Sequence, residues 1–233
     1  MINGTGEDKL GYEKIRFCGE QARKDGLLYF WIDTCCINKS IDAELSRSLN
    51  SMFYWYRQAD KCYVYLSDMS TTKRSTPVAD FPWKSDFRKS KWFTRGWTLQ
   101  ELLAPASVEF FSRERERLGD KSSLKKQIFE ITNIPYTALQ GHALSQFSKE
   151  DRLQWIQHRQ TKREEDKAYS LLGIFGVYIL PIYGEGQASA HTRLLDEFHK
   201  NQNCLCDLRT TDPRDDKKRI EQTKGGLLKD SYS

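Results

Sequence analysis

Short apolar runs alternate with amphipathic segments along the first half of the chain. Apolar residues at helical spacing predict helices over residues 12–25 and 42–59. Continuous apolar and aromatic runs predict buried strands over residues 27–32, 61–67 and 108–111. Helices between short, fully apolar strands are typical of βαβ units with a parallel sheet. The first half is therefore predicted to be an α/β unit.

The second half is predicted to be mainly helical. Helices are expected over residues 97–103, 122–132, 148–155 with Ser148 as N-cap, 163–172 and 194–198. Residues 69–91 contain two prolines and many Ser, Thr and Lys residues, which predicts a loop. From about residue 201 the pattern gives way to a charge-dense stretch, so residues 201–233 are predicted to form a linker.

Composition places the chain among globular proteins. Its 233 residues fit one ordinary domain plus a tail, and 12% aromatic residues argue against disorder. The net charge of +5 is spread along the chain without a basic stripe, so nucleic-acid binding is not predicted. No apolar run is long enough to span a membrane and no secretory signal is visible, which predicts a cytoplasmic protein with reduced thiols. The six cysteines lack zinc-ligand spacing, so no metal site is expected.

One acidic residue stands out in a chain without the common catalytic motifs. Phosphate-binding glycine loops and a nucleophile elbow are absent. Glu101 follows Trp97 by four residues, so the two share a helix face. A carboxyl group beside an aromatic ring can be desolvated and become reactive. Taken alone, these residues favour a plainer interpretation, in which Glu101 is a first-turn helix acid paired with Arg95 or Lys91.

A second candidate segment follows the first predicted strand. Residues 33–38 read Asp-Thr-Cys-Cys-Ile-Asn, which places Asp33 and Cys36 just beyond residues 27–32. Ligands of α/β proteins bind at the carboxyl ends of parallel strands. A ligand-binding role and a plain loop-and-cap role are both open for this segment.

Three sequence blocks resemble a known family. They read FWIDTCCINK at residues 30–39, WFTRGWTLQELLAP at 92–105, and REEDKAYSLLGI at 163–174 with YGEG at 183–186. Together they resemble the fungal HET (heterokaryon incompatibility) domain over roughly residues 8–200. Residues 212–232 resemble the segment that leads into a NACHT nucleotide-binding domain in NLR-like proteins with C-terminal WD repeats. The expected organisation is a HET domain over 8–200 and a linker over 201–233.

The resemblance implies an activity for Glu101. HET domains trigger programmed cell death when unlike fungal cells fuse, and they are related to TIR domains, which have a flavodoxin-like sheet. Some TIR domains cleave NAD⁺ with a glutamate four residues after a tryptophan, which is the spacing of Trp97 and Glu101. NAD⁺ is then a substrate, and no cofactor is expected. The residues implied for substrate binding are Trp97, Trp92, Arg95, Asp33 and Cys36.

Two further expectations accompany the resemblance. The alternative function is a non-catalytic adaptor that uses an exposed aromatic loop around residues 81–93, with the chain itself or other HET- or NACHT-containing chains as partners. The family's usual first strand, with its Ser-His-x-Trp motif, is not found in residues 1–10. In flavodoxin-like order this strand lies between the two predicted at 27–32 and 61–67. Without this strand, exposed backbone and apolar surface are expected between the two predicted strands. Three outcomes are open: the two strands pair directly, a second chain donates a strand, or the protein is a poorly stable, inactive remnant.

Overall fold

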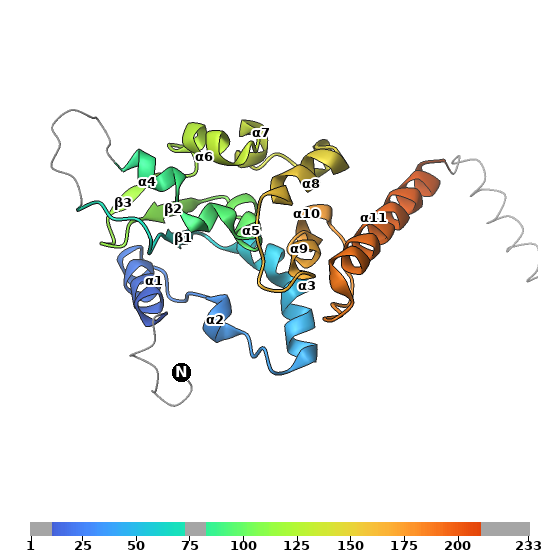
Figure 1. Ribbon diagram of the computed structural model, residues 1–233, viewed down its shortest axis with the longest axis horizontal. Helices are drawn as coiled ribbons and strands as arrows, with labels where there is room; N and C mark the ends of the chain where they lie inside the picture. Colours follow the sequence, from blue (N-terminus) through green and yellow to red (C-terminus); the bar gives the residue numbers. More distant parts are fainter. Residues whose placement is uncertain (1–10, 73–82, 211–233) are drawn as a thin grey trace, which may run out of the picture.

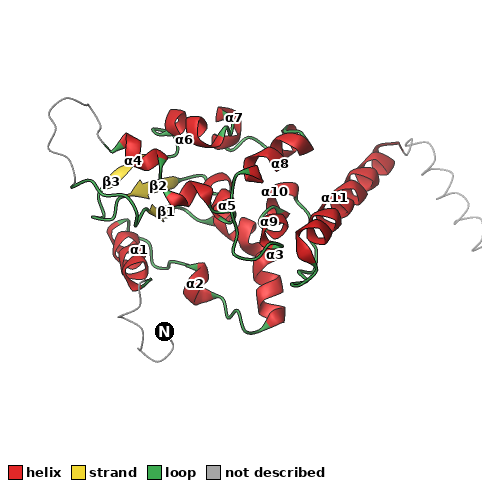
Figure 2. Cartoon of the chain, in the orientation of Figure 1, coloured by secondary structure: helices red, strands yellow, loops and turns green. Residues whose placement is uncertain are grey.

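A small sheet lies in the first half of the chain, and helices form most of the remainder (Figures 1 and 2). The computed structural model describes residues 11–72 and 83–210, with side chains described as far as residue 203. The elements of the first half are α1 (Tyr12–Lys24), α2 (Asp33–Cys36), α3 (Asp42–Gln58), β1 (Cys62–Tyr65), α4 (Lys84–Arg88), the 3-10 helix η1 (Lys91–Thr94), α5 (Thr98–Leu103) and β2 (Val108–Phe111). Those that follow are β3 (Arg117–Asp120), α6 (Lys125–Thr132), α7 (Tyr136–Leu139), η2 (Leu144–Gln146), α8 (Lys149–Gln157), α9 (Asp166–Tyr169), α10 (Leu172–Phe175) and α11 (Gly186–Thr210). The predicted α/β class with a mainly helical second half is confirmed.

Within residues 11–72 and 83–210, the sheet has three strands and is mixed. β1 and β2 pair in parallel with Cys62 opposite Val108, as expected for the strands predicted at 61–67 and 108–111. β3 pairs antiparallel with β2 and completes the order β1-β2-β3. The sequence did not predict β3, because Leu118 is the only large apolar residue in its four positions.

The two faces of the sheet pack against different elements. Val64 and Phe110 point into the main core, where they are 1% and 0% exposed. Phe17 of α1 packs on the opposite face, with ring centroids 5.1 Å from Tyr65 and 5.0 Å from Phe111. Figure 1 accordingly shows α1 on one side of the sheet and α4 and α6 on the other.

The prediction of a strand at residues 27–32 is wrong. This segment forms neither helix nor strand, and its side chains Leu28, Tyr29 and Phe30 are 89%, 88% and 45% exposed. A strand needs a neighbour to receive its backbone hydrogen bonds, and no described strand lies beside this segment. Direct pairing with the strand at 61–67 therefore does not occur, and the expected exposure of apolar surface is confirmed.

The described aromatic residues within 83–93 are not exposed, which corrects that expectation. Residues 73–82 lie outside the described part, but α4 forms within the predicted loop at 69–91 and η1 begins at its last residue. Phe87, Trp92 and Phe93 are 0%, 8% and 5% exposed. They pack around Phe110 of β2, because clustered rings bury more apolar surface inside the core than in a surface loop.

The second half follows the sequence pattern in part, and α7 and η2 were not predicted. Ser148 is the N-cap of α8, as predicted, and it forms a capping box with Asp151. The helix predicted at 163–172 is divided into α9 and α10. The last helix, α11, continues to Thr210, past the predicted start of the linker, while residues 211–233 lie outside the described part. None of the helices described is both long and apolar enough to cross a membrane.

Candidate functional site

The three sequence blocks meet in one aromatic cluster. Ile37, Leu49 and Met52 form its buried centre. Partly buried side chains from all three blocks surround them: Trp31 from the first, Trp97 from the second and Tyr183 from the third, together with Trp55 and Tyr56 of α3. The fold therefore brings together segments that lie far apart in the sequence.

Glu101 lies on α5 and is half-buried. The indole nitrogen Nε1 of Trp92 donates a hydrogen bond to Glu101 Oε2 at 3.0 Å. Arg95 and Lys91, both described, form no ion pair with Glu101, so the plainer prediction of such a pair is wrong. Because η1 turns the chain back toward α5, an indole nine residues away contacts the carboxylate.

The start of α5 is held by a buried arginine that the sequence did not reveal. Arg159 is 4% exposed, and its Nη1 donates to the Arg95 carbonyl oxygen and to Thr98 Oγ1, both at 2.9 Å. Thr98 Oγ1 in turn donates to the Trp92 carbonyl oxygen at 2.6 Å. Burial lowers the pKa of Arg159 to about 10, and the negative charge of Glu101 opposes this shift. Arg159 therefore joins η1 to α5 and places a positive charge within electrostatic reach of Glu101.

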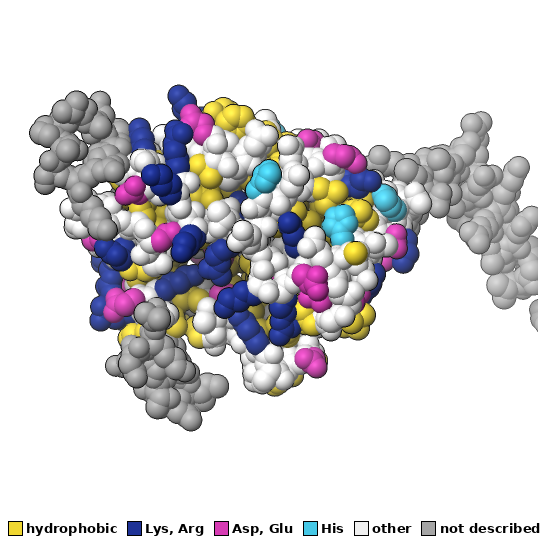
Figure 3. All heavy atoms as spheres, viewed as in Figure 1, with side chains coloured by type: hydrophobic (Ala, Val, Ile, Leu, Met, Phe, Trp, Pro, Cys, Tyr) yellow, Lys and Arg dark blue, Asp and Glu magenta, His cyan; other side chains and the backbone are white. Residues whose placement is uncertain are grey.

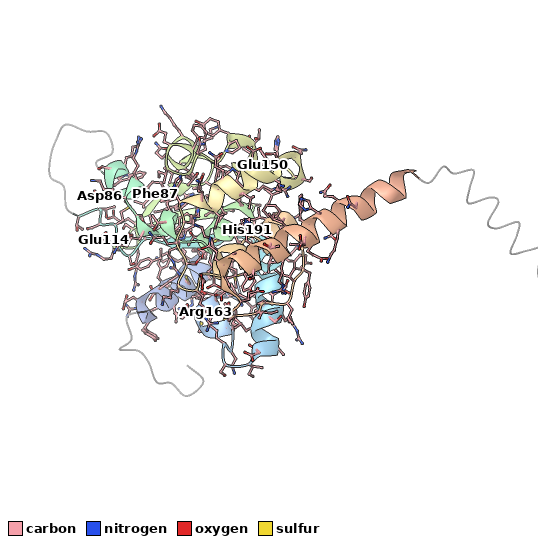
Figure 4. All side chains as sticks on the ribbon, turned by 45° about the vertical axis from the view of Figure 1, so that its right-hand side comes forward. Asp86, Phe87, Glu114, Glu150, Arg163 and His191 are labelled. Carbon is pink, nitrogen blue, oxygen red and sulfur yellow. The ribbon has the colours of Figure 1, made fainter. Side chains whose placement is uncertain are left out.

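Trp97 connects the second and third blocks. It occupies the N-cap position of α5, and its side chain lies close enough to the Asp166 carboxylate to lower the pKa of that group. Tyr183 donates a hydrogen bond to Asp166 Oδ1 at 2.9 Å. Burial raises the pKa of Asp166, and Tyr183 and Trp97 act against that shift. Arg163, labelled in Figure 4, lies 3.9 Å from the ring centroid of Tyr183.

The carboxylate of Glu165, the N-cap residue of α9, fixes the Tyr-Gly-Glu-Gly turn at residues 183–186. Glu165 Oε1 accepts hydrogen bonds from the backbone N–H groups of Gly184 at 2.7 Å and Gly186 at 3.3 Å. Hydrogen bonds from its own backbone N–H and from these two glycines lower the pKa of Glu165. Both glycines have positive φ angles of 96° and 81°, a conformation that disfavours side chains with a Cβ.

Tyr56 is where several predicted site residues converge. Its pKa is raised well above the ordinary value, first by burial and then by the charges of Glu101, Cys62 and Asp33, while Arg95 acts in the opposite direction. Glu101, Asp33 and Arg95 therefore lie within electrostatic reach of one phenol. Tyr56 was not among the predicted site residues, because the sequence pattern marked it as part of the apolar stripe of the helix predicted at 42–59.

Asp33 and Cys36 occupy the two ends of α2, not the end of a strand. Asp33 is half-buried and lies 3.5 Å from Lys39 Nζ, whereas Cys36 is exposed. Their expected position at the carboxyl edge of a parallel sheet is therefore wrong, because residues 27–32 do not form the strand. Asp33 still reaches the neighbourhood of Tyr56, and Cys36 lies at the surface.

The surface around α2 and α5 is basic. Lys and Arg side chains gather in the middle of the face seen in Figure 3, where Figure 1 shows these two elements. Exposed basic residues of the segments there include Lys39, Lys91 and Arg95. In the described part of the chain, no three His, Cys, Asp or Glu side chains are grouped to hold a metal ion.

Two cavities lie away from Glu101. One of about 550 Å³ lies between the start of α3 and residues 178–183, and is lined by Leu45, Tyr178 and Leu180 among others. The other, of about 440 Å³, lies at the start of β2 beside Lys121. Glu101 lines neither cavity.

Comparisons with known proteins identify relatives of the chain. Residues 12–86 match the family model described as "Heterokaryon incompatibility protein (HET)". The chain is 60% identical over 232 residues to "Vegetative incompatibility protein HET-E-1" of Podospora anserina. That alignment covers 100% of this chain and 17% of the relative, so the chain spans about a sixth of the relative's length. No solved structure matches the chain.

Proposed function

Because this chain belongs to the heterokaryon incompatibility (HET) family, we propose that it is a cytoplasmic cell-death effector domain in fungal non-self recognition. The observation that supports this proposal is the 60% identity to a vegetative incompatibility protein, which extends over the whole chain. We propose further that the domain acts as part of a longer, NLR-like protein, since the relative is several times longer. Its partners are then further copies of the chain or other HET- or NACHT-containing chains.

The proposed chemical activity is cleavage of NAD⁺ at the bond between nicotinamide and ribose. The supporting observation is the Glu101 carboxylate, oriented by the Trp92 indole at 3.0 Å, with the exposed basic residues Lys91 and Arg95 in the segment just before α5. Water adds to the ribose carbon, the bond to the pyridinium nitrogen breaks, and nicotinamide, ADP-ribose and a proton are the products. Nicotinamide leaves as a neutral molecule, so the reaction needs no general acid, unlike ordinary glycoside hydrolysis with its pair of carboxylates.

Each residue near Glu101 has a role in this proposal. Glu101 binds ribose hydroxyl groups and stabilises the positive charge that develops on the sugar. Trp97 stacks with a base, and Arg95 attracts the pyrophosphate, whose two negative charges match the basic face. Asp33 lines the rim on the other side of Tyr56. Trp92 is 8% exposed, so its role is better explained by the hydrogen bond to Glu101 than by stacking on substrate.

A non-catalytic adaptor is the second candidate function. It is favoured by a row of exposed apolar side chains beside the 550 Å³ cavity, where Tyr178, Leu180 and Ile182 are 66%, 61% and 46% exposed. Contiguous exposed apolar residues of this kind mark surfaces for protein contacts. In this proposal the row takes the place of the aromatic loop expected at residues 81–93.

The deciding experiment measures NAD⁺ loss by purified protein that is clustered through a fused oligomerisation tag. We expect wild type to consume NAD⁺ and release nicotinamide, and Glu101→Gln to lose at least about 100-fold in rate. Glu150→Gln is the matched control, because the Glu150 side chain is 74% exposed on α8 and lies far along the chain from the site.

The same proteins distinguish the two functions. Equal NAD⁺ loss in wild type and Glu101→Gln, or no loss from either folded protein, would refute the enzymatic proposal. Cell killing by clustered Glu101→Gln that equals wild type would then support the adaptor. Circular dichroism on every variant shows that the fold is intact.

A further inference from the structure

Two adjacent thiols are exposed at the end of α2. Cys35 and Cys36 are both free and exposed, and their Sγ atoms lie 3.8 Å apart. Cys18 and Cys62, by contrast, are buried. Neither sulfur of Cys35 or Cys36 acts as a nucleophile in the proposed activity, so that activity does not explain why the two thiols lie together.

The backbone of Ile32 holds both sulfur atoms. The Ile32 N–H donates to Cys36 Sγ at 3.5 Å, and the Cys35 thiol donates to the Ile32 carbonyl oxygen at 3.7 Å. The two side chains therefore point back toward the same turn of backbone and face each other. Such pre-organisation reduces the entropy lost when both sulfurs bind one ligand.

The separation of the sulfurs fits a chelate better than a disulfide. A disulfide requires the sulfurs to approach to about 2.05 Å, and it usually joins Cα atoms at least ~4.4 Å apart, whereas adjacent residues are held at about 3.8 Å. Two thiolates on one tetrahedral ion, each about 2.3 Å from the metal, lie roughly 3.8 Å apart. The observed 3.8 Å separation matches this second arrangement without movement of the backbone.

We propose that Cys35 and Cys36 form a bidentate dithiol site for a soft, thiophilic ion. Thiolates are the side-chain ligands that soft ions prefer. No third His, Cys, Asp or Glu of the described residues completes a metal group here. The site therefore favours a centre that arrives with its remaining ligand already attached, such as a monosubstituted arsenic(III) compound, whose pyramidal arsenic holds two sulfurs slightly closer than a tetrahedral ion does, so that a small rotation of the side chains completes the chelate. Asp33 is on the same short helix, so the bound ion lies at the rim of the candidate active site.

Phenylarsine oxide is a suitable probe, because its arsenic has two positions for thiols. In the reaction, the arsenic–oxygen bond breaks, two arsenic–sulfur bonds form, and the oxygen leaves as water with the two thiol protons. Arsenic stays in the trivalent state, so the step needs no oxidant or reductant. The adduct is measured by intact mass, and the affinity by titration.

The test uses the whole chain with Cys204→Ser and Cys206→Ser in every sample, because the side chains of this second pair lie outside the described residues. We expect one arsenic per chain, removed by a small dithiol but not by the same concentration of a monothiol. Cys35→Ser and Cys36→Ser, each alone, should weaken binding of the arsenic compound by on the order of 100-fold or more. With both cysteines present, the first arsenic–sulfur bond holds the second thiol at a high effective concentration, and either substitution removes this advantage. Thr34→Ser, at an exposed position of the same helix, is the matched control and should bind as the parent does.

Three results would overturn the proposal. They are no adduct with the parent protein, equal removal by monothiol and dithiol, and undiminished binding in either cysteine variant. Undiminished binding in both variants would assign the reaction to the buried thiols Cys18 and Cys62, which are present in all samples. The outcome does not depend on the proposed NAD⁺ cleavage, since the readout is binding and not activity.

Discussion

The contact between α10 and α3 allows a quantitative prediction. A Cβ atom placed on Gly173 would lie 2.0 Å from Phe53 Cβ and 2.3 Å from Phe53 Cγ. Ordinary contacts begin near 3.4 Å, so Gly173→Ala must push α10 away from α3 by more than 1 Å. Because the atom that is met is a Cβ fixed to the α3 backbone, a change of rotamer cannot relieve the clash.

The expected effect is the difference between two terms. Overpacking of a core typically costs 1–3 kcal/mol, and this clash belongs at or above the upper end of that range. Replacing glycine with alanine within a helix contributes up to about 1 kcal/mol of stability. Gly173→Ala should therefore lower the free energy of unfolding by about 2 kcal/mol, which corresponds to a fall in Tm of roughly 4–8 °C for a chain of this size.

The assay is urea unfolding followed by tryptophan fluorescence, with wild type, Gly173→Ala, Phe53→Gly and the double variant. Phe53→Gly removes the clashing Cβ together with the ring, so the double variant should be more stable than the sum of the single losses predicts, by at least about 1 kcal/mol. Gly11→Ala is the control, because nothing lies within 4 Å of a Cβ at that position, and it should stay within about 0.5 kcal/mol of wild type. Additive losses, or a Gly173→Ala variant as stable as wild type, would refute the reasoning.

Two further predictions concern pH. Hydrogen bonds from Ser70 and from the Thr71 backbone lower the pKa of Glu114 to about 2 from 4.5. Its contribution to the free energy of unfolding is therefore fully present above about pH 4.5 and is lost as the pH falls through 2. Glu114→Gln should therefore cost ~1–2 kcal/mol at pH 7, after allowance for solvent screening, and much less near pH 2; equal losses in urea melts at both pH values would contradict this. Burial lowers the pKa of Lys121 from 10.5 to about 8, so its charge opposes folding below pH 8 and the free energy of unfolding rises between pH 8 and 10.5. Lys121→Met should flatten this rise by up to about 3 kcal/mol, and an unchanged pH profile would show that Lys121 is not the group responsible.

The sequence predicted elements well where burial alone determines them. β1 is a continuous apolar run and β2 is apolar except for Glu109, and both form and pair in parallel. Residues 27–32 have the same composition but remain unpaired, because a strand also depends on a neighbour that composition does not reveal. β3 is the opposite case. Its polar sequence does not predict a strand, but β2 lies beside it and supplies a partner for its backbone hydrogen bonds.

The site was only partly visible in the sequence. The i to i+4 spacing singled out Trp97 beside Glu101, but the indole that contacts Glu101 belongs to Trp92, and Trp97 affects the pKa of Asp166 instead. Helical spacing describes neighbours within one helix, and it cannot show that η1 folds back onto α5. Arg159 is 58 positions beyond Glu101 and carries no local signal, so its link to the start of α5 required the three-dimensional structure.

The position of α1 on its own face of the sheet makes it an independently opening unit. Its buried contacts form a separate small cluster of Phe17, Cys18, Ile32 and Phe111, apart from the main core. Its surface is held by Arg115, which pairs with Glu13 at 2.7 Å and Glu20 at 2.6 Å, and such ion pairs weaken as salt screens them. Local fluctuations that release α1 therefore need less free energy than global unfolding, and salt favours them further. Each opening would bring the Cys18 thiol and one face of β1 into contact with water while the rest of the domain stays folded.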